Sequence, residues 1–120
     1  MRCGRRSDLS HNTEQTIDRI IELLEAVRQR PQMYLGELEH ERATVFLYGF
    51  QMSLRAVNEQ VPGFDLLKAA YTKRGWHFNA LGGVPDMMSK GLSSEGIVHE
   101  ILSAEIDAWK ALRLESASVP

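Results

Sequence analysis

The sequence has a single cysteine, only four prolines and no long apolar run. Because Cys3 cannot form an internal disulfide, the composition is typical of a protein of the reducing cytoplasm. A membrane span needs about 20 consecutive apolar residues, so we do not expect the chain to enter a membrane. Its formal net charge is −2, whereas a nucleic-acid binder usually has a basic surface. Nucleic acid is therefore disfavoured as a partner.

Catalytic and ligand-binding motifs are also missing. His40-Glu41 and His99-Glu100 begin like the zinc motif H-E-x-x-H, but the fifth position is Thr in one case and Ser in the other. The sequence contains neither a G-x-S-x-G nucleophile elbow nor a glycine-rich phosphate-binding loop. We therefore expect no catalytic residue, no metal, no cofactor and no enzymatic activity.

The first part of the chain predicts a tail and one amphipathic helix. Residues 1–11 are polar, and no hydrophobic segment follows Arg2, Arg5 and Arg6, so we expect a flexible tail rather than a secretory signal. Asn12 or Thr13 can cap a helix over about 13–29, which Pro31 ends. Its apolar face is spaced at i, i+3 and i+4 and consists of Ile17, Ile20, Ile21, Leu24 and Val27.

The longest periodic segment runs from residue 39 to about 60. Its wide apolar stripe includes Ala43, Phe46, Leu47, Phe50, Leu54 and Val57, and is widened by Val45, Tyr48 and Met52. We therefore expect this helix to be central and contacted from two sides. Before it, residues 33–36 predict an extended bridge or turn that buries Met33 or Tyr34.

The remaining segments predict two shorter elements and a last helix. Residues 65–73 indicate a short helix, and residues 76–81 allow a very short strand or extended segment. Pro85 suits the first turn of another helix. Ser93 or Ser94 can cap the last helix, whose face contains Ile97, Ile101, Leu102, Ile106, Trp109 and Leu112 or Leu114. We predict one all-α domain over residues 12–115, an irregular four-helix array or bundle, followed by a frayed end at 116–120.

The stretch from Leu23 to Gly36, L-L-E-A-V-R-Q-R-P-Q-M-Y-L-G, resembles the L-E-A-V-R-K-R-P-G-M-Y-I-G element of gyrase B and topoisomerase ATPase domains. In that family, the next helix carries the acidic residue that activates the attacking water and the asparagine that holds magnesium. The corresponding positions in the helix from Val45 to Val57 are apolar, glycine or glutamine. The resemblance thus implies a degenerate nucleotide-binding protein as an alternative, with no catalytic residue carried over.

The whole chain resembles a group of small bacterial proteins that combine an R-P-x-M-Y-L-G block with a long helix, a central glycine-tryptophan and an amphipathic last helix. Here these are Arg30 to Gly36, the helix after Glu39, Gly75-Trp76 and residues 93–114. Some members of that group look like immunity or antitoxin proteins. The resemblance implies an immunity or antitoxin protein that binds a cognate toxin and so neutralises it.

Partner contacts are expected where loops beside helix ends present side chains that the core does not use. We predict that the partner-binding residues are Arg30, Tyr34, Glu37, Glu39, Trp76 and His77. The acidic residues would attract a basic toxin surface. A structural or regulatory homodimer, paired through the long helix, is the alternative.

Overall fold

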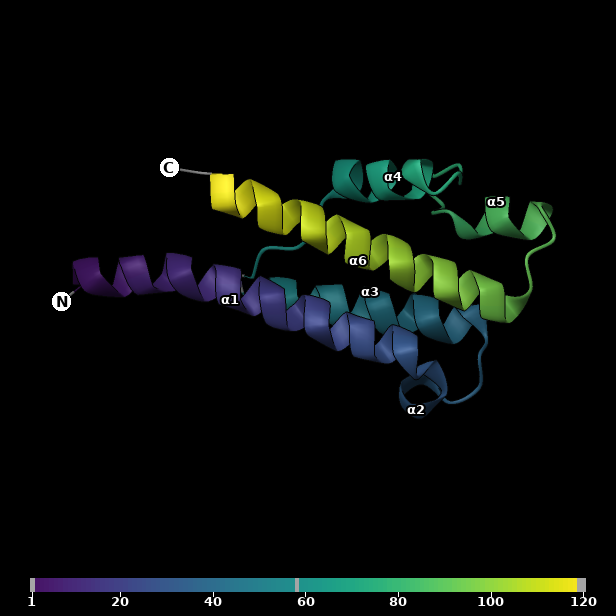
Figure 1. Cartoon of the computed structure of the whole chain (residues 1–120), viewed down its shortest axis with the longest axis horizontal. Helices are drawn as coiled ribbons and strands as arrows, with labels where there is room; N and C mark the ends of the chain where they lie inside the picture. The colour runs from purple at the N-terminus through teal and green to yellow at the C-terminus, as the bar shows by residue number, and fades with distance from the viewer. Residues whose placement is uncertain (1, 58, 119–120) are drawn as a thin grey trace.

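The computed structural model describes residues 2–57 and 59–118, with side chains described between residues 14 and 117. Within these ranges it contains six helices and no strand, which confirms the predicted all-α array. In chain order the helices are α1 (Arg2–Gln29), α2 (Pro31–Leu35), α3 (His40–Ala56), α4 (Phe64–Lys73), α5 (Val84–Ser89) and α6 (Ser94–Ser118), as Figure 1 shows. The molecule measures 55 × 28 × 22 Å along its principal axes.

The centre of the fold is α6, which contacts α1, α3, α4 and α5. Its buried side chains surround the helix instead of forming one stripe, as expected for a helix inside a core. They include Ile97, Val98, Ile101, Leu102, Ala104, Ile106, Ala108, Trp109 and Leu112. The Ser93 side chain accepts a hydrogen bond from the Gly96 amide at 3.1 Å, which confirms the predicted serine cap.

Helix α1 packs antiparallel to α6. Its predicted apolar face from Ile17 to Val27 is buried against the core, which confirms the prediction. Arg28 donates a hydrogen bond to the Ser103 hydroxyl at 3.2 Å, and Arg113 donates to the Asp18 carboxylate at 2.8 Å. The later residue of α1 thus contacts the earlier residue of α6, and the earlier residue of α1 the later one, so the two helices run in opposite directions. The helix ends at Gln29, as the following proline predicted.

Helix α3 runs parallel to α6. The His40 amide donates to the Ser94 hydroxyl at 3.0 Å, and the Gln51 amide nitrogen Nε2 donates to Glu105 Oε2 at 2.6 Å. In both pairs the partners are 54 residues apart in the sequence, so α3 and α6 run in the same direction. One side of α3 thus faces the core.

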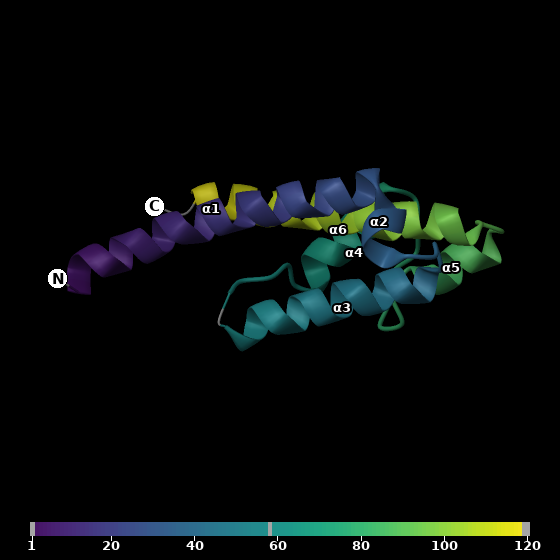
Figure 2. The same ribbon diagram turned by 90° about the horizontal axis from the view of Figure 1, so that it is seen from below.

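The prediction that this long helix is central was wrong. Only α2 and α6 contact it among the described helices, and Figure 2 shows it at an edge of the molecule. Val45 is 70% exposed and Tyr48 68% exposed, whereas Ala43 and Leu47 are buried. The width of an apolar stripe indicates how much surface a helix can bury but not whether a neighbour covers it. The helix also ends at Ala56, before the predicted residue 60.

The structure corrects the helix start predicted for the beginning of the chain. Helix α1 begins at Arg2, so the predicted start near residue 13, with Asn12 or Thr13 as its cap, is wrong. From residue 5 to 29 there is no proline or glycine to interrupt a helix, and α1 runs through the segment expected to be a tail. At the other end, α6 reaches Ser118, and the last two residues of the predicted frayed end lie outside the described ranges.

The segment after Pro31 is a short helix instead of the predicted extended bridge or turn. Pro31 stands in its first turn, where the fixed φ of proline favours a helix start and its missing amide proton is not needed. The buried residue is Leu35, and both Met33 and Tyr34 are exposed. Gly36 ends the helix at φ +75, in a region that favours glycine.

The elements between α3 and α6 largely follow the predictions. Helix α4 matches the predicted range within one residue, and Pro85 lies in the first turn of α5. The segment expected to be a short strand contributes only a single bridge between Asn79 and Gly82. None of the helices in the described ranges is long and apolar enough to cross a membrane.

Candidate functional site

Four of the six predicted contact residues lie together around α2. Arg30 precedes this helix and Tyr34 lies within it, and both are exposed. Glu37 and Glu39 are exposed in the loop that leads to α3. The Arg30 amide donates to the Ala26 carbonyl at 3.1 Å, so the turn between α1 and α2 continues directly from the end of α1. The structure thus keeps these four residues close together around α2.

Glu37 and Glu39 form an acidic pair. A side-chain hydrogen bond between them raises the pKa of Glu39 above its ordinary value, while the charge of Arg42 lowers it. Two neighbouring carboxyl groups resist simultaneous ionisation because their charges repel. A cation placed beside the pair would relieve this repulsion.

Exposed apolar side chains lie along α3 and on the segments beside it. We call this surface the α3 face and define it as Tyr34, Val45, Tyr48, Met52 and Leu81. Tyr34 and Val45 line a groove of about 440 Å³ between α2 and α3, while Tyr48 and Leu81 share the rim of a second cavity. Leu81 is 80% exposed. Adjoining apolar side chains on a surface mark an interaction site more often than scattered ones do.

Trp76 and His77 lie elsewhere, in the loop between α4 and α5, which Figure 1 places on the opposite side of α6 from α2. Trp76 Nε1 donates to the Glu100 carboxylate at 2.7 Å, and Lys90 Nζ lies 5.4 Å from the centre of the Trp76 ring. These contacts tie Trp76 to α6 and α5. The His77 side chain is exposed, and its backbone amide donates to Asp86 at 2.8 Å.

The same loop is held by a charged network around Glu100. Arg74 donates two hydrogen bonds to this carboxylate, at 3.0 and 3.1 Å, and a third to Asp107 at 3.4 Å. Burial disfavours ionisation of Glu100, but the hydrogen bonds from Arg74 and Trp76 outweigh it and lower its pKa. The network joins the end of α4 to α6 and leaves Trp76 less available to a partner.

Sequence reasoning missed Glu105, which lies on α6 with only 3% of its surface exposed. Trp109 Nε1 donates to Glu105 Oε2 at 3.1 Å, the same oxygen that accepts the bond from Gln51. Burial raises the pKa of Glu105, although these two hydrogen bonds lower it in part. A carboxylate inside the apolar run from Ile101 to Trp109 was the sequence signal that could have revealed it.

Glu105 also lines a cavity of about 230 Å³ between α3, α4, α6 and the loop before α5. The rings of Tyr71 and Phe78 line it too, stacked with their centres 4.5 Å apart. A Cβ on Gly83 would come within 2.6 Å of the Tyr71 ring, so glycine allows the loop to approach α4 closely. We call this cavity the Glu105 pocket.

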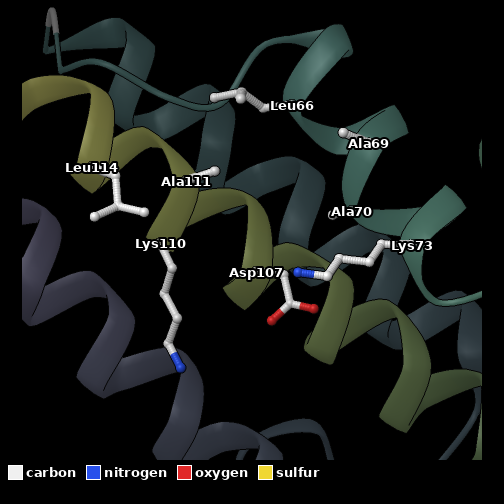
Figure 3. A pocket seen from close by; sticks show the side chains of 8 residues that line it. All are labelled: Leu66, Ala69, Ala70, Lys73, Asp107, Lys110, Ala111 and Leu114. Atoms are coloured by element: carbon white, nitrogen blue, oxygen red, sulfur yellow. The ribbon is translucent and has the colours of Figure 1, made fainter.

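A further groove of about 340 Å³ separates α4 from α6 and is shown in Figure 3. Leu66, Ala69 and Ala70 face it from α4, and Asp107, Lys110, Ala111 and Leu114 from α6. In the close-up, the Lys73 amine points toward the Asp107 carboxylate. The groove therefore combines an apolar floor with charges of both signs.

No three histidine, cysteine, aspartate or glutamate side chains in the described ranges are grouped so that they could hold a metal ion. The side chain of His11 lies outside those ranges. Comparisons of the chain with protein-family models, with curated proteins and with solved structures each find no match.

Proposed function

We propose that this protein is a non-catalytic bacterial protein-binding module, an immunity or antitoxin protein that neutralises a cognate toxin in the cytoplasm by covering its surface. The observation that carries the proposal is the α3 face: among the described helices only α2 and α6 contact α3, and Val45 and Tyr48 remain 70% and 68% exposed. Exposed tyrosines such as Tyr34 and Tyr48 suit this role, because aromatic residues dominate the binding energy of protein interfaces.

The charges beside the α3 face support a partner with a basic surface. Glu37, Glu39 and Glu41 are exposed next to it, and the first two repel each other. A lysine or arginine of the partner placed between them removes that repulsion and adds an attraction. Opposite charges at the rim of an interface mainly accelerate association.

The test is co-expression with the product of the neighbouring gene. If the proposal is correct, this chain rescues growth of cells that produce the neighbouring toxin, and the two proteins elute as a stoichiometric complex. A neighbour that is not toxic, or a toxic neighbour that is neither bound nor neutralised, would contradict the proposal.

Variants locate the surface. Tyr48→Ala should weaken the complex by about 2 kcal/mol, or about thirtyfold in Kd, as expected for an aromatic residue at the centre of an interface. Leu114→Ala is the matched control, since Leu114 is similarly exposed but lies in the groove of Figure 3. Glu37→Lys combined with Glu39→Lys should slow association at low salt and leave the midpoint of thermal unfolding nearly unchanged. A large drop in that midpoint would show that the two residues stabilise the fold.

The uncovered side of α3 also favours the second candidate, a structural or regulatory homodimer. In that case, light scattering of the isolated chain gives the mass of a dimer at micromolar concentration, and Val45→Asp converts it into a monomer. A monomer in both samples would exclude pairing through this helix.

A further inference from the structure

The Glu105 pocket is built from side chains that are distant in the sequence. Glu105 reaches it from α6, Gln51 from α3 and Tyr71 from α4, while Phe78 and Leu81 come from the loop before α5. Aliphatic lining is added by Leu47, Leu67, Val84 and Ile101. The pocket is thus an apolar cavity with one acidic group.

That acidic group has no cationic partner in the pocket. Its two hydrogen bonds come from neutral donors, the Gln51 amide and the Trp109 indole, and both go to Oε2. Among the described residues that line the cavity there is no lysine, arginine or histidine. Buried carboxylates are normally paired with a cation, because an unpaired charge is costly to remove from water.

The walls suit a cation on an apolar stem. Tyr71 and Phe78 line the same cavity as Glu105 and offer aromatic surface against which an apolar stem can pack. At about 30 Å³ for each water-sized group, 230 Å³ holds about seven or eight such groups. This is the size of a guanidinium or ammonium group on a short alkyl or benzyl stem.

We propose that the Glu105 pocket binds an organic cation, a guanidinium or primary ammonium group on a short apolar stem. The charged group pairs with the Glu105 carboxylate, and the stem lies against Tyr71 and Phe78. The same chemistry is offered by a free amine and by an arginine or lysine side chain of another protein. This site adjoins the proposed toxin contact, because Tyr48 and Leu81 border both.

The experiment is an NMR titration of the full chain at constant ionic strength. The probes are n-butylguanidinium, phenethylammonium and N-acetyl-arginine amide, with n-pentanol as the neutral control. We expect saturable shifts at Gln51, Tyr71 and Glu105 with the cations, and binding of n-pentanol at least about tenfold weaker. Tighter binding of the arginine amide than of the free amines indicates a protein side chain as the natural occupant, and the reverse order indicates a free amine.

Variants make the test specific. Glu105→Gln should weaken binding of the cations at least about tenfold, while Glu95→Gln, the same change at an exposed position of α6, should not. Thr44 is exposed on α3 and lines the pocket, so Thr44→Trp should block entry without disturbing the core, which keeps the test informative even if Glu105→Gln does not fold. The proposal is overturned if no cation saturates the pocket, if n-pentanol binds as tightly, or if Thr44→Trp leaves binding unchanged.

Discussion

The hydrogen bond between Gln51 and Glu105 gives a quantitative test of the core, through the substitution Gln51→Leu. The substitution keeps a side chain of similar size and removes a donor only 2.6 Å from a carboxylate that is 3% exposed. A hydrogen bond to a charged group contributes about 1.5–3 kcal/mol. Because Gln51 is half-buried, the added apolar surface of leucine returns about 0.5 kcal/mol. The free energy of unfolding should therefore fall by about 1–2.5 kcal/mol at neutral pH.

The thermal midpoint follows from the size of the chain. An unfolding entropy of about 2.1 cal/mol/K per residue gives about 0.25 kcal/mol/K for 120 residues, so each kcal/mol shifts the midpoint by about 4 °C. Gln51→Leu should thus lower it by about 4–10 °C. Urea unfolding followed by tryptophan fluorescence gives the free energy directly, since both tryptophans are retained. Gln29→Leu, at an exposed position of α1, is the control and should change stability little.

The loss of stability caused by Gln51→Leu should depend on the charge of Glu105. A loss that does not change with that charge would refute the reasoning. The pKa of Glu105 is raised on folding, so the native state keeps this proton to higher pH than the unfolded chain does. The contribution of this bound proton to stability is complete below the ordinary pKa of glutamate, near 4.5, and is lost as pH rises through the raised pKa of Glu105. Gln51→Leu should cost more at pH 8 than at pH 4.5, and less by about 1 kcal/mol in a Glu105→Gln background. Equal costs at both pH values, together with additivity in the double variant, would show that the bond is not made to a buried charge.

Two further predictions concern the glycines and the charged network. Gly83→Ala should destabilise the protein by about 1–3 kcal/mol in urea unfolding, because its Cβ would overlap the Tyr71 ring. Gly49 lies inside α3, and an added Cβ there would have nothing within 4 Å. Gly49→Ala should therefore stabilise the protein by about 0.5–1 kcal/mol. Equal effects of the two substitutions would refute the packing of the loop on α4. Arg74→Met should lower stability at pH 7 by about 1–2 kcal/mol. Because folding lowers the pKa of Glu100, the loss of stability caused by Arg74→Met should fade as pH falls through this lowered pKa. A loss of stability that persists in acid would show that Arg74 acts through packing alone.

The sequence was sufficient to predict the segments in which local signals agree. The buried face of α1, its end before Pro31 and the serine cap of α6 follow from spacing and capping, which act within a few residues. The short helix α2 was missed because a five-residue helix has no periodicity to detect and depends on Pro31 and Gly36 for its ends.

Which helix lies at the centre of the fold could not be predicted, because the burial of each helix depends on its neighbours. The helix α3 has the wider apolar stripe, yet Val45 and Tyr48 point away from the core. The helix α6 carries Ser103 and Glu105, and both are buried because partners on α1 and α3 meet them. For the same reason the Glu105 pocket was missed, since its lining comes from four separate segments. Of the predicted contact residues, the four around α2 are neighbours, but Trp76 and His77 lie on another side.

The position of α6 has a consequence for biosynthesis. Helices α1, α3, α4 and α5 all pack on a segment that a ribosome makes after them. Until residues 94–118 have left the exit tunnel, the apolar sides that α1, α3, α4 and α5 turn toward α6 remain uncovered and open to wrong association. Newly made chains therefore depend on rapid packing once α6 has emerged, or on a chaperone that shields α1 and α3 until then.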